Sequence, residues 1–406
     1  MCTSKMMKAL LCLSLLICNN LLFGESSSQF VQDTCTPTSA GDSSIDDVPS
    51  ISKALSTCGN RGTIIIPAGK TFSIRSPLDF SNCKGCNFQI EGTLKTSDDI
   101  EYWKGKTAFF LLQNVVGGSF SSVTGSGVID GSGQAFWDYF ASHKEYQRPL
   151  LLFFNGVTNV TFTNIQLMNP PKMFVTVKGN SANVKLSNLV LTAISKSANP
   201  PKNTDGFDIG ECSNVTLTNM HVTNGDDCVA FENGANYVTV ENFTCIGSHG
   251  ISIGSLGVAA GRAYVVQNVY VSNAKMINCA AATRIKFYPG GPSHGTVAVH
   301  NVTYKDITVD NSDYALQIDN CYATDTSKCK EHPSAAKLSN IRFININGKT
   351  SKKYDPIVAK IECPPKGTCD VAFTQWNIDA PSGKSTVLCS YYDHPSGIKC
   401  TPGVSF

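Results

Sequence analysis

A six-residue pattern recurs eight times along this chain and constrains the fold more than any other feature. Each copy opens with a polar residue, most often Asn, followed by Val or Ile, and closes with Asn, Asp or Gln. Between these ends, apolar and polar residues alternate, which is the period of a strand with one buried face. The copies start 23 to 39 residues apart, at Asn159, Asn183, Asn214, Tyr237, Asn268, Asn301, Asn340 and Asp370.

Repeats of this length that hold a few short strands predict a β-solenoid. A single coil cannot bury its own apolar face, whereas stacked coils pair strand on strand about 4.8 Å apart and bury a continuous column. A β-sandwich is not expected, because its turns come at shorter intervals and without self-similarity. We therefore predict an all-β fold, a single right-handed parallel β-helix, in which the Asn at the sixth position stacks from coil to coil.

The first 24 residues have the pattern of a secretory signal peptide. Lys5 and Lys8 precede an apolar run over residues 9–18, which is too short to span a bilayer. A transmembrane anchor is the alternative interpretation. We predict a secreted, extracellular protein that binds no membrane. Because no Pro- or Ser-rich linker divides the rest, residues 25–406 should form a single catalytic domain.

The cysteine count fits an oxidising compartment. Three of the 17 Cys leave with the signal peptide, and the even number that remains predicts disulfides. Apolar positions at helical spacing over residues 47–56 predict a short helix that caps the first coil, flanked by Cys35 and Cys58. Three further pairs are close enough to close small loops, although the sequence does not fix the pairing: Cys321/Cys329, Cys363/Cys369 and Cys389/Cys400.

The mature chain carries almost no net charge. Without residues 1–24 it has 31 basic and 31 acidic residues. A nucleic-acid partner is not expected from this balance, and attraction of a polyanion must be local. Four Asn-x-Ser/Thr sequences are possible N-glycan acceptors, although all four belong to copies of the repeat: Asn159, Asn214, Asn242 and Asn301.

Five polar stretches follow copies of the repeat, and each precedes an apolar strand. For four of the five, the offset from the start of the repeat is 12 to 16 residues. Because stacked coils repeat their geometry, we expect these stretches to form one patch about 20 Å long, which suits a groove for several sugar units. The stretches carry Asp205, Asp226 with Asp227, His249, Arg284 with Lys286, and Tyr314.

The acids and the imidazole have the residue types of acid–base catalysis. Adjacent Asp226 and Asp227 can converge only at a coil corner, for which Gly225 is suited. Like charges crowded beside Asp205 should raise one carboxyl pKa, as a general acid requires. His249 is placed to tune the proton of that acid. The alternatives are an acid pair that caps a turn, a structural His, and a calcium site.

Arg284 and Lys286 flank Ile285, so strand alternation places both cations on the outer face. A solvated surface is the ordinary explanation of such a pair. Alignment with the acids and His249 favours a clamp for a carboxylate instead. Together the five stretches predict acid–base hydrolysis of an anionic polymer.

The motifs in this order resemble those of the polygalacturonases, glycoside hydrolase family 28, over about Cys35 to Cys400. The resemblance implies a right-handed parallel β-helix that hydrolyses α-1,4-linked galacturonic acid by single displacement with inversion. We expect no cofactor and no metal. Ser248-His-Gly and Lys286-Phe-Tyr-Pro-Gly290 are most similar to fungal exopolygalacturonases and xylogalacturonan hydrolases, and the segments 199–210 and 309–314 are most similar to the latter. The motifs are Asn203-Thr-Asp205, Gly225-Asp-Asp-Cys228, His249-Gly-Ile-Ser-Ile-Gly-Ser255 and Arg284-Ile-Lys286.

The resemblance also implies residue roles. Asp226 matches the general acid that protonates the leaving oxygen, Asp205 and Asp227 match the carboxylates that activate water, and His249 matches the residue that assists the acid. Inversion leads us to expect about 6.5–9.5 Å between Asp226 and the water-activating carboxylates. The remaining matches are Arg284 and Lys286 for the substrate carboxylate, Asn203 and Tyr314 for subsite positions, and Cys228 with Cys245 for a disulfide.

Some questions stay open in the sequence. Gly225 stands where many members of the family have Gln, which suggests a hypothesis of a wider subsite for a xylose branch. The expected partner is a pectic polysaccharide, galacturonan with or without xylose, bound by a monomer; endo and exo action are not distinguished. A calcium-dependent pectate lyase and a non-catalytic β-helix that binds carbohydrate are the alternative functions.

Overall fold

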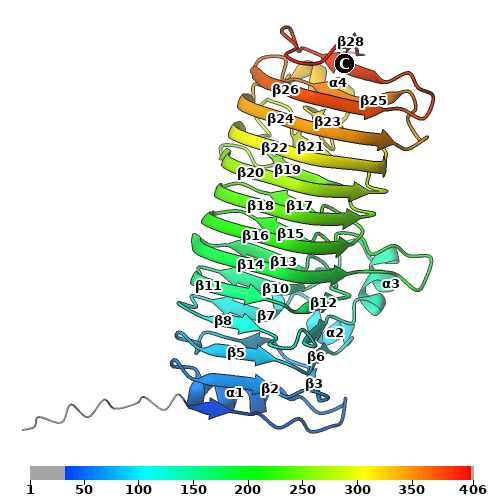
Figure 1. Cartoon of the computed structure of the whole chain (residues 1–406). Helices are drawn as coiled ribbons and strands as arrows, with labels where there is room; N and C mark the ends of the chain where they lie inside the picture. Colours follow the sequence, from blue (N-terminus) through cyan, green and yellow to red (C-terminus); the bar gives the residue numbers. More distant parts are fainter. Residues whose placement is uncertain (1–32, 404–406) are drawn as a thin grey trace, which may run out of the picture. The chain divides into compact units, whose positions relative to one another are not determined.

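The computed structural model describes residues 33–403. The predicted signal peptide, residues 1–24, lies outside the described residues, and from Asp33 onward the chain forms one compact unit. Within the described part, no helix has the length and apolar character needed to cross a membrane. The unit is a stack of coils whose strands follow one another in sequence order along the stack (Figure 1).

Almost all regular structure lies in two parallel sheets that wrap around one core. The larger sheet contains β1 (Thr34–Cys35), β2 (Thr63–Ile66), β3 (Thr71–Ile74), β5 (Asn87–Ile90), β6 (Thr93–Thr96), β8 (Ser119–Ser121), β9 (Val128–Asp130), β11 (Thr158–Thr163), β12 (Gln166–Met168), β14 (Ser181–Thr192), β16 (Cys212–Thr223), β18 (Ala235–Ile246), β20 (Ala263–Ile277), β22 (Thr296–Ser312), β24 (Lys337–Thr350) and β26 (Thr368–Asp379). The smaller sheet contains β4 (Leu78–Asp79), β7 (Ala108–Gln113), β10 (Leu150–Asn155), β13 (Val175–Lys178), β15 (Phe207–Ile209), β17 (Val229–Phe231), β19 (Ile251–Leu256), β21 (Thr283–Phe287), β23 (Leu316–Asp319), β25 (Ile357–Glu362), β27 (Thr386–Ser390) and β28 (Thr401–Pro402).

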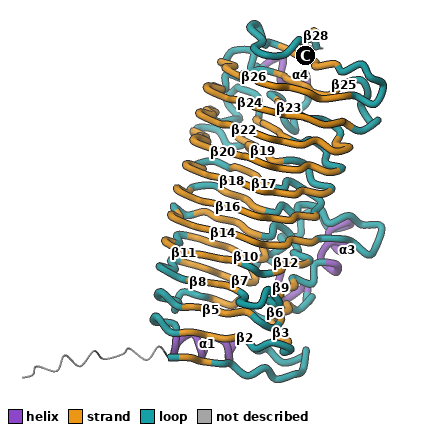
Figure 2. The backbone as a smooth tube through the Cα atoms, viewed as in Figure 1, coloured by secondary structure: helices purple, strands orange, loops and turns teal. Residues whose placement is uncertain are grey.

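From β14 onward each coil consists of one long strand of the larger sheet followed by one short strand of the smaller sheet. Each crossover returns to the same sheet with the right-handed sense usual for parallel strands. The chain is therefore the right-handed parallel β-helix that the repeats predict. The few helices, α1 (Val48–Cys58), α2 (Ile100–Trp103), α3 (Gln134–Ser142) and α4 (Thr326–Glu331), lie in or beside the connections between strands, and α3 projects from the side of the stack (Figure 2).

The core is a column of apolar residues in register. Val215 pairs with Val238, Val238 with Val269, and the same ladder continues into Val302 and Ile341. These side chains are almost completely buried. A second ladder places aromatic rings in stacks, with the ring centroids of Tyr304 and Phe343 5.2 Å apart and the rings nearly parallel, and those of Phe343 and Phe373 5.1 Å apart. Burial of these faces is the main favourable term for a solenoid, because no coil covers its own face.

Asparagine ladders line the outside of the bends, as the sixth position of the repeat predicts. Asn219 Nδ2 donates to Asn188 Oδ1 at 2.9 Å, Asn242 donates to Asn219, and Asn273 donates to Asn242. All four have a positive φ, which Asn tolerates better than other residues with a side chain. Each Asn therefore bends the strand and bonds to the next coil. The four predicted glycan acceptors lie in such ladders with exposed side chains, and their modification stays a prediction.

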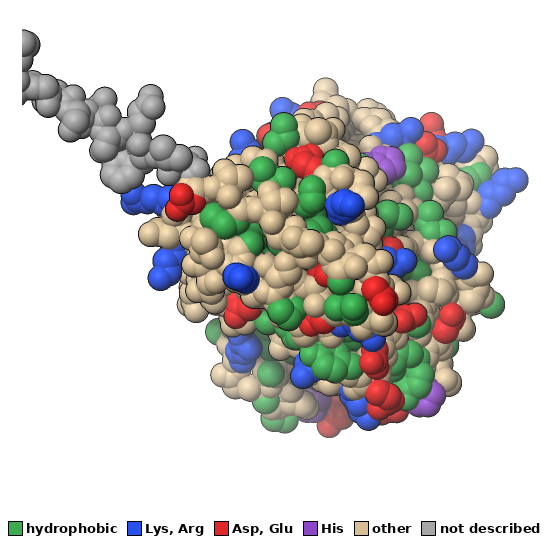
Figure 3. All heavy atoms as spheres, turned by 90° about the horizontal axis from the view of Figure 1, so that it is seen from below, with side chains coloured by type: hydrophobic (Ala, Val, Ile, Leu, Met, Phe, Trp, Pro, Cys, Tyr) green, Lys and Arg blue, Asp and Glu red, His purple; other side chains and the backbone are tan. Residues whose placement is uncertain are grey.

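Disulfides close the connections near both ends. The helix α1 overlaps the predicted helix over residues 47–56, packs against β1, β2 and β4, and is joined to β1 by Cys35–Cys58; its role as a cap stays a prediction. The three small-loop pairs, whose pairing the sequence left open, each form a disulfide. Two further disulfides join Cys83 to Cys86 and Cys228 to Cys245, and the second of these is discussed below. Basic and acidic side chains are interspersed on the N-terminal end of the stack, in line with the near-zero charge (Figure 3).

The asparagine ladder gives a direct stability prediction. Asn219→Ala removes a donor to Asn188 and an acceptor for Asn242, and it places an alanine at φ 59°. We expect a loss of about 2 kcal/mol in the free energy of unfolding, measured by urea titration. Asn219→Gly, which tolerates the positive φ, should lose only about half as much. An alanine variant as stable as the wild type would contradict this account of the ladder.

Candidate active site

The predicted site residues share one corner of the β-helix. Thr223 at the end of β16 pairs with Ile246 at the end of β18, and Ile246 pairs with Ile277 at the end of β20. On the other side of the corner, Val229, Ile251 and Thr283 pair in the same order. The turns between these paired residues are therefore stacked, and they carry the acid pair, His249 and the start of the Arg284 strand.

Asp226 lies at the centre of a small hydrogen-bond network. His249 Nδ1 lies 3.0 Å from Asp226 Oδ1, and Asn203 Nδ2 donates to Asp226 Oδ2 at 3.2 Å. The side chain of His249 is 44% exposed and that of Asp226 is 17% exposed, so both are open to a ligand. The three residues come from three successive coils, as the stacking of repeats predicts.

Asp227 is the buried partner of the pair. Its Oδ1 accepts a hydrogen bond from Ser252 Oγ at 2.7 Å, and its Oδ2 lies 2.5 Å from Lys286 Nζ. Its side chain is only 1% exposed. Both carboxylate oxygens are thus held by donors from the next two coils, so this buried charge is paired and hydrogen-bonded as a stable fold requires.

The expected carboxyl separation is wrong for Asp226 and Asp227. An oxygen of one carboxylate lies within 4.8 Å of an oxygen of the other, closer than the predicted range of about 6.5–9.5 Å. The physical reason is local: the side chain of Asp226 folds back and accepts a hydrogen bond from the backbone N–H of Asp227 at 2.9 Å. That bond holds neighbouring carboxylates together at the corner.

Burial and crowding raise the pKa of Asp205, but not that of Asp226. Burial, together with the charges of Asp208, Asp226 and Asp227, holds the pKa of Asp205 well above its usual range. Burial also strongly raises the pKa of Asp208, whose Oδ2 has no hydrogen-bond partner within residues 33–403. Asp208 was not singled out in the sequence, where its place inside an apolar strand gave no signal of a buried acid.

The proton expected on Asp226 belongs instead to its pair with His249. Burial would raise the pKa of Asp226, but the hydrogen bond and positive charge of His249, with the charge of Lys286, lower it. The same hydrogen bond raises the pKa of His249 against the opposing effect of burial. The raised carboxyl pKa predicted for one of the acids is therefore that of Asp205. The hydrogen bond between Asp226 and His249, which repeat spacing does not predict, lowers the pKa of Asp226 instead.

The two cations lie on one side of β21, as strand alternation predicts, although Lys286 is covered. Both lie over the ring of Tyr322, with Arg284 Cζ at 5.5 Å and Lys286 Nζ at 5.4 Å from its centroid. Lys286 is 6% exposed. Burial disfavours its charge, but the ion pair with Asp227 raises its pKa. Arg284 Nε is buried without a hydrogen-bond partner in the described structure, so this one donor of the guanidinium is not used by the protein.

Tyr314 lies farther along the same corner. Its ring stacks on Tyr354 at 4.6 Å with an interplanar angle of 8°. Burial, together with the nearby Tyr354 phenol and the carboxylates of Asp313 and Glu362, raises the pKa of Tyr314 to about 12, so the phenol keeps its proton. The half-buried ring pair forms an aromatic surface next to the charged patch, of the kind on which sugar rings pack.

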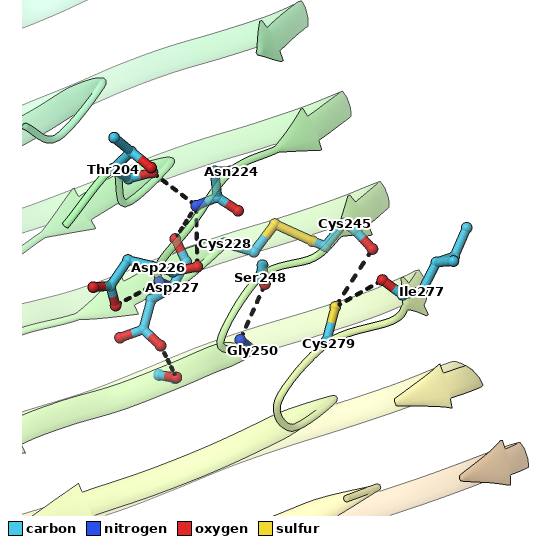
Figure 4. Close-up of a disulfide and its surroundings, with 11 residues drawn as sticks. Thr204, Asn224, Asp226, Asp227, Cys228, Cys245, Ser248, Gly250, Ile277 and Cys279 are labelled. Carbon is cyan, nitrogen blue, oxygen red and sulfur yellow. Dashed lines mark hydrogen bonds between the residues drawn. A yellow bond between two sulfur atoms is a disulfide. The ribbon is translucent and has the colours of Figure 1, made fainter. Parts of the chain in front are cut away.

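The side chain of Asn224 and a disulfide hold the acid turn in shape. Asn224 Nδ2 donates to the carbonyls of Thr204, Asp226 and Asp227, and so ties two coils together at the corner. Immediately after the acids, Cys228 is joined to Cys245, the pair that the resemblance implied (Figure 4). The disulfide links the residue before β17 to the end of β18 in the next coil.

The hypothesis that Gly225 widens a subsite is wrong in its physical premise. A Cβ atom at this position would lie 2.6 Å from the carbonyl oxygen of Pro201 and 3.1 Å from its ring. The space is therefore filled by the inserted segment around Pro200 and Pro201. Gly225 is needed because this segment approaches the turn, and Lys202 forms a backbone bridge with it.

Arg148 is a site residue that sequence reasoning missed. It is 7% exposed, and its guanidinium donates to the carbonyls of Pro171 and Lys202 and to Asn203 Oδ1 at 2.8 Å. Its Cζ lies 3.7 Å from the centroid of the Phe140 ring. Burial lowers the pKa of Arg148 to about 10, and Asp205 and Asp226 act against that shift. Arg148 lies outside the repeats, in the connection that follows α3, so periodicity gave no signal for it.

A metal fits this arrangement poorly. Ligand atoms of Asp226, Asp227 and His249 lie within 4.8 Å of one another. Calcium takes six to eight oxygen ligands, whereas this set offers an imidazole nitrogen, and Lys286 already holds one oxygen of Asp227. The donor set therefore favours proton transfer over calcium binding, and the expectation of no metal stays a prediction.

Comparisons with known proteins agree on one family. The model of "Glycosyl hydrolases family 28" matches residues 58–400. "Endo-xylogalacturonan hydrolase A" of Aspergillus tubingensis is 51% identical over 379 residues, 93% of each chain, and a probable enzyme of the same name from Aspergillus niger has the same identity and coverage. The crystal structure of the A. tubingensis protein has a TM-score of 0.91 and covers 92% of this chain and 100% of its own. A polygalacturonase from Erwinia carotovora ssp. carotovora, 21% identical over 88% of this chain and 96% of its own, shares the fold with a TM-score of 0.69.

The Arg148 contacts predict that this residue positions the acid. Arg148→Lys keeps the charge but lacks the planar fork that holds Asn203 Oδ1, so Asn203 Nδ2 should no longer be fixed toward Asp226. We expect kcat on polygalacturonate to fall about 10- to 100-fold with little change in KM. Steady-state kinetics on protein with an unchanged melting curve measures this.

The matched control is Arg342→Lys, because Arg342 forms a surface ion pair with Asp370 on the far strands of the larger sheet. This control should retain wild-type kinetics. A folded Arg148→Lys protein with an unchanged kcat would show that the Arg148 network has no part in the reaction.

Proposed function

Since the chain belongs to glycosyl hydrolases family 28 and is a polygalacturonase-type hydrolase of pectin, we propose that it cleaves the α-1,4-galacturonosidic backbone of xylose-branched galacturonan from within the chain. The relatives that are about half identical over almost their whole length carry the name endo-xylogalacturonan hydrolase. The observation that carries the chemistry is the juxtaposition of Asp226 and His249 with Asp205, Asp227 and Lys286 at one corner.

The Asp226–His249 pair supplies the proton to the leaving group. At the free-enzyme stage the pair holds one proton, shared across the 3.0 Å contact between His249 Nδ1 and Asp226 Oδ1. As the bond from the anomeric carbon to the bridging oxygen breaks, negative charge develops on that oxygen, and Asp226 passes it the proton while His249 compensates. Asn203, fixed by Arg148, holds the other oxygen of Asp226.

Asp205 and Asp227 together activate the attacking water, and Asp205 receives its proton. The raised pKa of Asp205 makes its ionised form a stronger proton acceptor. Asp227 is held by Ser252 and Lys286, so its charge is fixed in place beside the water position. With both oxygens engaged and a side chain that is almost completely buried, Asp227 is poorly placed as a nucleophile. We therefore propose single displacement by water with inversion, despite the short approach of Asp226 and Asp227.

Arg284 and Lys286 bind the carboxylate of a galacturonate unit. The Arg284 side chain has an unused donor in the described structure, and the ammonium of Lys286 has donors beyond the one that contacts Asp227. Tyr314, with its ring stacked on Tyr354, provides a neighbouring sugar contact. This set recognises the uronate, whereas a neutral sugar would give Arg284 no anionic partner.

We further propose that the protein acts outside the cell as a monomer without a cofactor. Six disulfides within residues 33–403 suit an oxidising compartment. The alternatives from the sequence are less well supported. A pectate lyase would need a calcium site that the donor set does not favour, and a binding module has no need of an acid with a His partner.

The function is tested by the products from xylosylated and bare polygalacturonate. We expect saturated oligomers of intermediate size in the presence of a chelator, faster release from the xylosylated polymer, and a first product of inverted anomeric configuration by proton NMR. Asp226→Asn should lower turnover at least ~100-fold and leave binding largely intact. Unsaturated products, or retention at the anomeric carbon, would overturn the proposed chemistry.

The pH dependence tests the shared proton. His249 keeps its proton above its usual pKa because of Asp226, so in the wild type the acid is lost only as pH rises through this raised value. In His249→Gln the proton is lost at the pKa of the Asp226 carboxyl itself. The alkaline limb of kcat/KM should then move to lower pH by at least ~1 unit. An alkaline limb that stays in place would assign the titrating group to another residue.

A further inference from the structure

A polar cavity opens on the N-terminal coils, and none of the proposed catalytic residues lines it. Its volume is about 410 Å³, and its walls come from the ends of β3, β6, β9 and β12, from the start of α3 and from the segment after β14. Together with Ser43, which precedes α1, the cavity is therefore built by six separate segments of the chain. The residues that carry the argument are Arg75, Lys95, Thr96, Gly133, Gln134 and Lys196.

The cavity carries positive charge that the protein does not neutralise. Arg75, Lys95 and Lys196 all line it, and none of them forms an ion pair with an acid in the part of the chain that the structure describes. Lys95 and Lys196 are exposed, and one nitrogen of Arg75 donates to the carbonyl of Ser43 at 3.0 Å. Three unpaired cations around one cavity favour an anionic ligand.

The start of α3 adds backbone donors to the same wall. Gly133, the N-cap of this nine-residue helix, has no side chain to cap the first turn, and no acidic residue lies in that turn. The first N–H groups of a helix have no partner within the helix, and the helix dipole adds partial positive charge there. Gly133, Gln134 and Ala135 line the cavity, so the uncapped end of α3 forms part of its wall.

A buried hydroxyl in the same wall lacks a partner. Thr96 is 3% exposed and lines the cavity, and its Oγ1 makes no hydrogen bond within residues 33–403. A buried polar atom without a partner costs free energy that a ligand or water recovers. The hydroxyl therefore points to a bound group independently of the cations and of the helix.

Two acids also line the cavity and do not cancel its charge. Asp130 Oδ1 accepts hydrogen bonds from Ser132 N at 3.0 Å and from Asn169 Nδ2 at 3.1 Å, so its charge is used to shape the loop. Asp98 is exposed to solvent. Three cations and the helix end therefore outweigh the two acids.

The cavity lies on the same line of corners as the acid turn. Backbone pairing runs without a break from Lys95 to Asp130, Met168, Thr192 and Thr223, the last residue of the strand before the acid turn. Four steps of about 4.8 Å separate Lys95 from Thr223. A polymer that runs along this edge from the catalytic corner toward the N-terminal coils would thus pass the cavity.

We propose that this cavity binds the carboxylate of a distal galacturonate unit of the same pectic chain that is cleaved at Asp226. The inference rests on the proposed function, because its occupant is part of that substrate. The Lys95 and Lys196 ammonium groups and the uncapped end of α3 bind the carboxylate, and Thr96 provides a hydroxyl to the same sugar. The site makes long chains better substrates than short ones.

Chain length is the readout that tests this site. We compare kcat/KM for trigalacturonate and for longer oligogalacturonates up to a decamer, with wild type and Lys95→Met/Lys196→Met. The wild type should gain with length, and the double variant should lose about 10-fold on the long substrates. On the trimer, which is too short to span both sites, the two proteins should agree. The control is Lys185→Met, which removes an exposed lysine of β14 outside the cavity and should keep the wild-type length dependence.

The binding arm uses the Asp226→Asn background and titrates the trimer and the decamer by calorimetry. Tighter binding of the decamer that is lost with the two lysines supports one chain across both sites. Equal loss for both lengths would overturn it, because the lysines would then act on a separately bound sugar. An unchanged length dependence would also overturn it, with the proposed function intact. If the wild type cleaves no pectic polymer, the proposed function fails. The site is rejected as well if the two lysine substitutions leave binding of the decamer unchanged.

Discussion

The parallel pairing of one coil with the next is the constraint on which the rest of this structure depends. A corner has a fixed place in the register, so any residue a set distance after the end of one long strand lies above its counterpart in the next coil. Thr223, Ile246 and Ile277 illustrate this at the acid corner. Apolar ladders inside and asparagine ladders outside oppose a slip of the register, which would turn buried side chains outward.

The site exploits that register by balancing charges between coils. The acid of one coil is bonded to the imidazole of the next, and its neighbour Asp227 is paired with a lysine from the coil after that. Each buried charge therefore depends on the correct stacking of at least two turns. Two connections then pack against the acid corner. Arg148, in the connection after α3, binds the carbonyl of Lys202 and fixes Asn203. The Pro200–Pro201 segment lies against Gly225.

The sequence predicts whatever repeats and little of what does not. The solenoid, the asparagine ladders and the gathering of Asp226, His249 and Lys286 all follow from period and offset. Arg148 lies in a non-repeated connection, and its contacts depend on how that loop folds, so no spacing rule identifies it. The predicted distance between the carboxylates of Asp226 and Asp227 was wrong, and the burial of Lys286 was not predicted, for a similar reason. Both depend on side-chain hydrogen bonds, to Asp227 N and to Asp227 Oδ2, that strand alternation does not describe. The close approach of Pro201 to Gly225 likewise became visible only in three dimensions.

The most direct test of the central claim is the crystal structure of an Asp226→Asn protein with a bound galacturonate oligomer. If stacked corners form one reactive site, the oligomer lies along them, with a bridging glycosidic oxygen within about 3.2 Å of the residue 226 side chain. A uronate carboxylate then contacts Arg284 or Lys286. An oligomer bound to a different face of the β-helix, with residue 226 free of sugar, would contradict the account.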